Sequence, residues 1–312
     1  MPSDSFNQIQ LSIVTPCFNE ALTIRECVTR LSNSLNAIGI TFEHILVNNA
    51  SLDNTLEVLT SLKNEFAHVR VLDNEFNIGA FRSMQRGIST AHGELIVPFL
   101  AADCQDPPEL IRSMIEIRIN SLCDTVAGIR KIRHDNFLIT LFRKLFYKII
   151  YIATRGKYRA GSSEFRLMLT SRARRLADIK DATPFLRIYM AQLQGNIQYI
   201  EYEMAERTAG VSSASFFPLV DDALNGITLA APSLFSRLLI FSLTSVGLSI
   251  SGLVTILIFD LFGKSSPSEL ILALIGIFAT SIFITIQCWI GHYIFLIHSQ
   301  LRSGPTATTI EL

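Results

Sequence analysis

Three short polar runs in the first third of the chain carry the side chains best suited to chemistry. Each run follows an apolar stretch rich in β-forming residues, and together they comprise Asn19-Glu20, Asn48 to Asp53, and Asp103 to Asp106. Burying a carboxylate such as Asp103 at the end of an apolar strand costs free energy, so its presence there favours a functional role. We therefore take Asp103 as the best single candidate for a functional carboxylate.

The elements that would position these runs follow a regular rhythm. Apolar β-type stretches alternate with helical patterns; the strands are expected at 11–15, 42–47, 69–72 and 94–100, and the helices at 21–37, after Asp53, at 80–91 and from Pro107. Repeated strand-then-helix units predict a parallel sheet covered on both faces. Ligands of such sheets bind at the carboxyl ends of the strands, so the loops 15–20, 48–55 and 101–106 should line one cleft.

Composition narrows the function classes. The 312 residues include 27 Lys and Arg against 27 Asp and Glu, so no excess positive charge indicates a nucleic-acid partner. The five cysteines show no metal-ligand spacing, and we interpret them as reduced packing residues. The polar N-terminus lacks the basic-then-apolar pattern of a secretory signal, so we expect the first part of the chain to stay in the cytosol.

The last quarter of the chain has the composition of a membrane segment. Residues 238–259 and 270–291 contain no charged side chain, and about 20 apolar residues in a helix cross the ~30 Å hydrocarbon core. Arg237 and Arg302 flank the outer ends of this pair, whereas Lys264 is the only Lys or Arg in the connector. By the positive-inside rule both termini lie in the cytoplasm. The alternative is a buried hairpin of a soluble protein.

A second contact with the membrane is predicted between the two parts. Residues 137–152 place Arg143, Lys144 and Lys148 among large apolar side chains. This pattern is typical of an amphipathic helix that lies in the membrane interface. The alternative is an ordinary packed helix.

The order of these motifs resembles the inverting family-2 glycosyltransferases, and in particular the polyprenyl-phosphate sugar transferases such as dolichyl-phosphate mannose synthases and bactoprenol glucosyltransferases. The resemblance covers nearly the whole chain, including the terminal pair of apolar segments. It rests on VTPCFNE at 14–20, VNNASLDNT at 47–55, NIG at 77–79, ADCQDPPE at 102–109 and EFRL at 164–167.

The resemblance implies an α/β GT-A (Rossmann-like) domain that binds a nucleotide-sugar, followed by a two-helix transmembrane hairpin. It assigns the nucleotide-sugar site to the polar loops, where the residues involved are Pro16, Asn19, Glu20, Asn49, Asp53, Gly79 and Asp103. The implied metal ligands are Asp103 and Gln105, which would hold Mg²⁺ or Mn²⁺ against the diphosphate leaving group.

The acceptor implied by the resemblance is a polyprenyl phosphate. Its phosphate needs cations, and arginines bind such groups in bidentate geometry; the candidates are Arg130, Arg133 and Arg143. The alternative is that these cations anchor the chain to anionic lipid. Because the phosphate is already nucleophilic near neutral pH, no general base is required. The catalytic set implied by the resemblance is Asp103, Arg130, Arg133, Glu164 and Arg207.

Several of these residues have a purely structural alternative. Asn19 and Asn49 are typical loop-capping residues, and Glu20 suits the first turn of a helix. Asp106 precedes two prolines and could act only as the N-cap of the helix that follows.

The sequence also departs from the family pattern. Asn48-Asn49 stand in place of an acidic pair, Ala101 in place of the first aspartate of D-x-D, Glu164 in place of aspartate, and Ser213 in place of lysine. These changes leave two alternatives to a transfer to polyprenyl phosphate: a partner subunit that has lost catalysis, and a transferase that acts on another membrane glycolipid.

We expect the following organisation. A cytoplasmic GT-A domain occupies 1–210, a juxtamembrane interfacial segment 211–233, the two membrane helices 234–299 and a cytoplasmic tail 300–312. The expected partners are a nucleotide-sugar, a polyprenyl phosphate and the inner (cytoplasmic) membrane, in a homo-oligomer that serves the synthesis of envelope polysaccharide.

Overall fold

The computed structural model describes residues 9–131, 147–148, 150–151, 156, 158–179, 186–193, 195–205, 216–262, 268–301 and 309–311. It forms two compact units. One comprises Met1–Asp222 with Gly304–Leu312, and the other comprises Ala223–Ser303.

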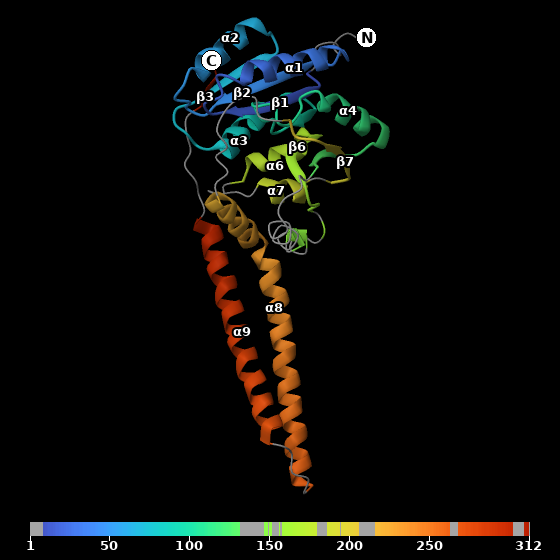
Figure 1. The fold of residues 1–312 in the computed structure, drawn as a ribbon, viewed down its shortest axis with the longest axis vertical. Helices are drawn as coiled ribbons and strands as arrows, with labels where there is room; N and C mark the ends of the chain where they lie inside the picture. Colours follow the sequence, from blue (N-terminus) through green and yellow to red (C-terminus); the bar gives the residue numbers. More distant parts are fainter. Residues whose placement is uncertain are drawn as a thin grey trace, which may run out of the picture. The chain divides into compact units, whose positions relative to one another are not determined.

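The first unit is built on a sheet in which eight strands follow the order β7-β5-β6-β4-β1-β2-β3-β8. Figure 1 labels β1, β2, β3, β6 and β7 among them. The strands are β1 Leu11–Cys17, β2 Phe42–Asn48, β3 Val69–Asn74, β4 Leu95–Val97, β5 Thr125–Arg130, β6 Ser162–Leu169, β7 Ile197–Tyr202 and β8 Thr309–Glu311. The helices are α1 Ile24–Asn36, α2 Thr55–Glu65, α3 Ala80–Thr90, α4 Leu110–Ser121, α6 Thr170–Ala177 and α7 Leu186–Leu193. The predicted α/β fold is confirmed.

The parallel part of the sheet follows the predicted rhythm. Strand β1 pairs in parallel with β2 and β4, and β2 pairs in parallel with β3. The predicted parallel arrangement is confirmed for these strands. Beyond them the sheet is mixed, because β6 runs antiparallel between β4 and β5 and β8 runs antiparallel to β3. Both strands lie in the part of the chain where the strand-then-helix repeat has ended.

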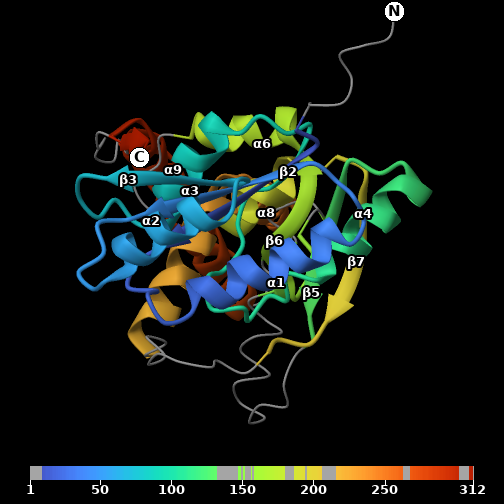
Figure 2. The same cartoon turned by 90° about the horizontal axis from the view of Figure 1, so that it is seen from above.

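Helices cover both faces of the sheet because its strands are apolar on both sides. Every residue of β2 is buried, as expected for a central parallel strand. One core layer joins the sheet to α1, α2 and α4, and the other joins it to α3, α6 and α7. Figure 2 shows α1 and α6 on opposite sides of the strands.

The second unit contains most of two long helices, α8 Phe216–Leu261 and α9 Ser268–Leu301. Within them, Arg237–Phe259 and Ser268–Ile294 are long and apolar enough to cross a membrane. These spans agree with the predicted 238–259 and 270–291 to within a few residues. From Phe216 onward, the segment predicted as interfacial is part of α8.

Candidate functional site

The loops after β1 and β2 are tied together at the carboxyl edge of the sheet. The backbone N–H of Leu52 donates to Asn19 Oδ1 at 2.8 Å, and the N–H of Asn19 donates to Ser51 Oγ at 3.1 Å. Asn19 has a φ of 59°, a left-handed conformation that asparagine adopts more readily than most residues. The amide of Asn19 therefore fixes the shape of this edge, and its role in binding a nucleotide stays a prediction.

The first turn of α2 holds the carboxylate of Asp53 in place. The N–H of Thr55 donates to Asp53 Oδ1 at 3.0 Å, the Thr55 hydroxyl donates to the same oxygen, and the N–H of Ala21 donates to Oδ2 at 3.4 Å. Burial acts to raise the pKa of Asp53, but these hydrogen bonds outweigh it and lower the pKa. The side chain is exposed and negatively charged at neutral pH.

Glu20 is held in the same corner. Its backbone N–H donates to Thr55 Oγ1 at 2.8 Å, and its carboxylate accepts a hydrogen bond of 2.6 Å from Thr23 Oγ1. Pro16 lies one residue before the end of β1 and is half-buried. Because these hydrogen bonds already hold the loops in place, little conformational entropy is lost when their polar groups bind a ligand.

The asparagine pair at the end of β2 connects that strand to the loop after β3. Asn49 donates through Nδ2 to Asn77 Oδ1 at 2.8 Å and accepts from the N–H of Ile78 at 2.9 Å. Asn48 donates through Nδ2 to Asp73 Oδ1 at 2.7 Å. Both amides are buried, so these bonds satisfy groups that would otherwise be costly to bury.

Gly79 follows in the same loop and precedes the first residue of α3. Its φ of 82° is a conformation that favours glycine over any residue with a Cβ. Its N–H donates to Asn77 Oδ1 at 2.9 Å, so the backbone of this turn is fixed by the same asparagines.

Asp103 lies in the loop after β4. Strand β4 pairs with β1, the strand that precedes the first polar loop. The N–H and the Nε2 of Gln105 donate to its two carboxylate oxygens at 3.2 and 2.9 Å. The following residue, Cys104, is buried and has a φ of 56°. This geometry places the two predicted metal ligands, Asp103 and Gln105, against each other on one turn.

A second charged cluster is centred on Asp106, the residue that follows Gln105. The buried carboxylate of Asp106 faces Arg130, with Nη2 at 3.0 Å from both oxygens, and it also accepts a hydrogen bond from the Tyr202 hydroxyl. Arg130 Nε lies 3.1 Å from the same hydroxyl. The alternative that Asp106 is only a helix N-cap is wrong, because α4 begins at Leu110 with Glu109 at its N-cap.

Charge and burial shift the protonation of this cluster. The pKa of Tyr202 is raised, first by burial and then by the negative charge of Asp106. Burial works against the charge on Arg130, but Asp106, Tyr202 and the nearby Glu164 raise its pKa above the ordinary arginine value. The cluster therefore holds a cationic Arg130 whose side chain is 30% exposed.

Three of the predicted arginines, Arg133, Arg143 and Arg207, lie outside the described residues, as does most of the predicted surface helix 137–152. The polar residues that sequence reasoning missed are Tyr202 and Ser163, which lies 3.2 Å from the Tyr202 hydroxyl. No motif marks either residue. Only the sheet, which brings β5, β6 and β7 side by side, reveals their contact with Asp106.

The fold and the loops at its carboxyl edge define a glycosyltransferase of the GT-A type. A model of the family described as glycosyl transferase family 2 matches residues 12–177. The chain belongs to that family, as its sequence motifs predicted.

Two relatives extend the similarity beyond the family domain. The uncharacterized glycosyltransferase sll0501 of Synechocystis sp. is 27% identical over 312 residues, which cover 97% of this chain and 96% of the relative. The uncharacterized glycosyltransferase YkcC of Bacillus subtilis is 28% identical over 309 residues, which cover 95% and 92%. The similarity therefore includes the C-terminal apolar helices.

Among solved structures, the chain is similar to glucosyl-3-phosphoglycerate synthase from Mycobacterium tuberculosis. The TM-score is 0.51 at 15% sequence identity, over 72% of this chain and 79% of the synthase. At this identity the likeness supports the fold and leaves the substrate open.

Proposed function

We propose that the chain transfers a sugar, with inversion, from a nucleotide-sugar to a polyprenyl phosphate at the cytoplasmic face of a membrane. The observation that carries this proposal is the position of Asp103 and Gln105. They lie on one turn at the edge of the sheet where the loops after β1 and β2 are held together. In a family 2 domain, that edge is where a donor and a cation would meet.

The donor side is supported by the groups that this edge presents. The loops after β1 and β2 hold amides and the carboxylate of Asp53, which can accept hydrogen bonds from a nucleoside. The structure of the Mycobacterium tuberculosis synthase contains UDP and Mn²⁺. We propose a UDP- or GDP-sugar for this chain, bound by the predicted set that includes Asn19, Asn49 and Gly79.

The residues fit a hard divalent cation that is shared with its substrate. Among the described residues no group of three or more His, Cys, Asp or Glu side chains could hold a metal by itself. Mg²⁺ commonly binds through one or two carboxylates together with substrate phosphates and water. Asp103 supplies the carboxylate and Gln105 an adjacent amide. When bound, Mg²⁺ or Mn²⁺ would neutralise the charge that develops on the leaving diphosphate.

For the acceptor, we assign Arg130 to the phosphate, together with Arg133 and Arg143. Arg130 is oriented by Asp106 and Tyr202 and keeps part of its guanidinium exposed. A phosphate group with a second pKa of about 6 is largely dianionic at neutral pH. Positioning and charge neutralisation can then drive an in-line attack without a general base. Glu164 and Arg207 complete the proposed catalytic set.

The membrane location is supported by the distribution of side chains on α8 and α9. The buried positions include Ser242, Ser249, Ser281 and Cys288, whereas most leucines, isoleucines and phenylalanines of the two spans are exposed. The hydroxyl oxygens of Ser245 and Ser281 lie 2.8 Å apart, and the Thr285 hydroxyl donates to Ser242 Oγ at 2.9 Å. Small polar residues between helices with apolar residues outside are typical of membrane helix pairs.

Arg237 and Arg302 at the outer ends of the pair favour a cytoplasmic position for both ends. We propose the inner membrane as the location and a homo-oligomer as the assembly.

The proposal is tested with the full chain in detergent. Undecaprenyl phosphate, Mg²⁺ or Mn²⁺, and a panel of UDP-, GDP- and dTDP-sugars are supplied, and nucleotide release is measured. Release that requires the lipid phosphate, disappears in Asp103→Ala and persists in Glu116→Ala would support the proposal. Glu116 is a suitable control because its exposed carboxylate pairs with Arg112 on α4.

Silence across the panel in a folded protein would instead favour a partner subunit without catalysis. Release that needs a different glycolipid would keep the enzyme and replace the acceptor.

A further inference from the structure

The C-terminus of the chain returns to the glycosyltransferase sheet. After α9 ends at Leu301, β8 pairs antiparallel with β3, and the partners are Leu72 with Glu311, Asp73 with Ile310, and Asn74 with Thr309. This strand belongs to the first compact unit although the whole hairpin separates it from the rest of that unit. Neither its length nor its polar surroundings would predict a strand from sequence.

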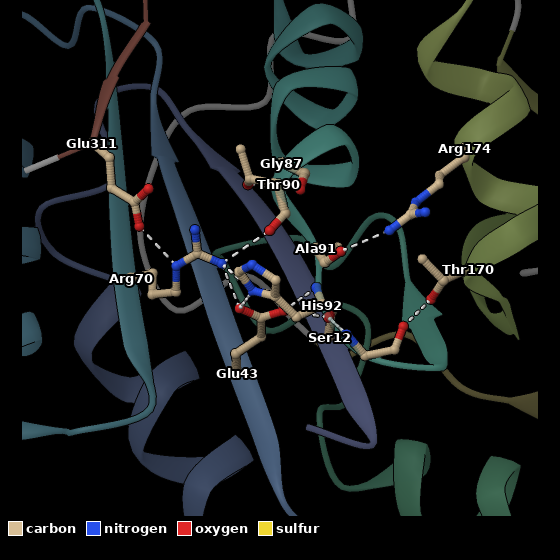
Figure 3. Close-up of polar contacts among 11 residues, drawn as sticks. Ser12, Glu43, Arg70, Gly87, Thr90, Ala91, His92, Thr170, Arg174 and Glu311 are labelled. Atoms are coloured by element: carbon tan, nitrogen blue, oxygen red, sulfur yellow. Dashed lines mark hydrogen bonds and ion pairs between the residues drawn. The ribbon is translucent and has the colours of Figure 1, made fainter. Parts of the chain in front are cut away.

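Arg70 on β3 recognises the acidic residue of this strand. Its Nε donates to Glu311 Oε1 at 2.8 Å, as Figure 3 shows. Its Nη1 is directed the other way and donates to Glu43 Oε2 at 2.6 Å and to the carbonyl of Thr90 at 3.0 Å. One guanidinium therefore connects the exposed tail to a buried carboxylate.

The buried carboxylate is part of a network at the amino ends of the parallel strands. Glu43 is 2% exposed, and its Oε1 accepts from Ser12 Oγ and from the N–H of His92, both at 2.6 Å. The Ser12 oxygen in turn accepts from the N–H of Gly93 at 2.8 Å. Because this network holds Arg70 in place without the tail, the Nε of Arg70 is presented at a fixed position for a carboxylate.

The edge of β3 also needs a partner on physical grounds. An open edge strand exposes unpaired N–H and C=O groups that readily pair with another chain. Within the described residues, β8 is the strand that covers this edge. The hydrogen bond from Arg70 is the largest cause that lowers the pKa of Glu311, and the carboxylate is therefore charged at neutral pH.

We propose that the β3 edge is a docking site for the C-terminal strand of the same chain, and that β8 is a latch that Arg70 locks through Glu311. The chain is then part of the glycosyltransferase unit both before and after the α8–α9 hairpin. The amino-edge network that presents Arg70 stands apart from the loop of Asp103, so the latch does not depend on the identity of the donor or of the acceptor.

Cross-linking in the full chain tests this proposal. The double variant Asp73→Cys with Ile310→Cys places two thiols at directly opposed positions, whose Cβ atoms are about 4.5–5.5 Å apart in an antiparallel pair. A short thiol cross-linker should join them within one chain and give a monomer of altered mobility on a denaturing gel. The single variants, and Glu116→Cys with Ile310→Cys, should give no such product.

Addition of Glu311→Gln to the double variant tests the lock. The ion pair is partly exposed, so the rate of cross-linking should fall about two- to fivefold. An unchanged rate would overturn the role of Arg70. A covalent dimer would show that the strand docks on a second copy, and no product in a folded protein would show that it does not dock; either result would overturn the latch. Cross-linking is read without turnover, so its failure is distinct from a failure of the proposed activity.

Discussion

The carboxylate of Asp106 is fully buried and lies 3.0 Å from the guanidinium of Arg130, which reaches it from the end of β5. A buried carboxylate of this kind is stable only when its oxygens are paired. Here the pairing also determines where Arg130 points. The same interaction therefore stabilises the fold and prepares a cation beside the loop of Asp103.

The first prediction concerns Tyr202, whose hydroxyl donates to Asp106. Tyr202→Phe removes this donor from a buried carboxylate, so the free energy of unfolding should fall by about 1–3 kcal/mol. The KM for the lipid phosphate should rise because Arg130 loses a neighbour at 3.1 Å. Tyr199→Phe on the same strand is the control. Thermal melting and steady-state kinetics measure the two effects; equal melting of both variants would contradict the prediction.

The sequence was sufficient to predict the first half of the fold. Strands β1 to β4 are short runs rich in apolar and β-branched residues, each followed by a helical pattern. Their length and composition favour buried strands, and the alternation with helices favours a parallel sheet. The position of Asp103 at the carboxyl edge follows from that order alone. Local pattern and global fold agree in this part of the chain.

The contacts made by Asp106 could not be predicted in the same way. Its partner Tyr202 is 96 residues away in the chain, and the pairing arises because β5 lies between β6 and β7. The local sequence, an acid before two prolines, instead favours a helix cap. Strand β8 escaped prediction for a related reason, since its stability comes from the edge of β3 and from Arg70 rather than from its own residues.

The second prediction concerns the metal. Asp103→Asn keeps the shape of the side chain but removes the charge that a divalent cation needs, so the affinity for Mg²⁺ or Mn²⁺ should fall at least about tenfold to 100-fold. A metal titration of nucleotide release measures the shift. Glu116→Gln should give the wild-type curve, and a wild-type curve for Asp103→Asn would remove Asp103 from the metal site.

The third prediction concerns Gly93, which precedes β4. A Cβ added there would lie 2.6 Å from the backbone N of Ser12 and 2.8 Å from the carbonyl oxygen of Leu95. Because backbone cannot move aside easily, Gly93→Ala should cost about 1–3 kcal/mol or more. In Gly39→Ala the new Cβ meets no atom within 4 Å, and only the positive φ of 67° disfavours alanine. The free energy of unfolding should therefore fall by about 1 kcal/mol. Thermal melting should rank Gly93→Ala as clearly the less stable; the reverse order would refute this packing argument.

The fourth prediction concerns His44 and the stability of the fold in acid. His44 is buried on β2, with Nε2 at 2.9 Å from Thr15 Oγ1. Burial, with a smaller effect of His68, lowers the pKa of His44 from 6.5 to about 3. As the pH falls below 6.5, His44 becomes protonated in the unfolded chain, whereas in the folded chain it stays neutral until the pH nears 3. The fold therefore loses stability across that window, by up to about 1.4 kcal/mol per pH unit.

His44→Gln removes this titration while keeping a side chain that can hydrogen-bond to Thr15. The variant should be less stable than the wild type at pH 7, because it loses the fit of the imidazole. Between pH 7 and pH 5, however, its melting temperature should fall less than that of the wild type, since about 2 kcal/mol of acid destabilisation is absent. Half-buried His68, whose pKa is also lowered by burial, retains a residual slope in both proteins. Parallel melting profiles for the two proteins would show that His44 is not held neutral by the fold.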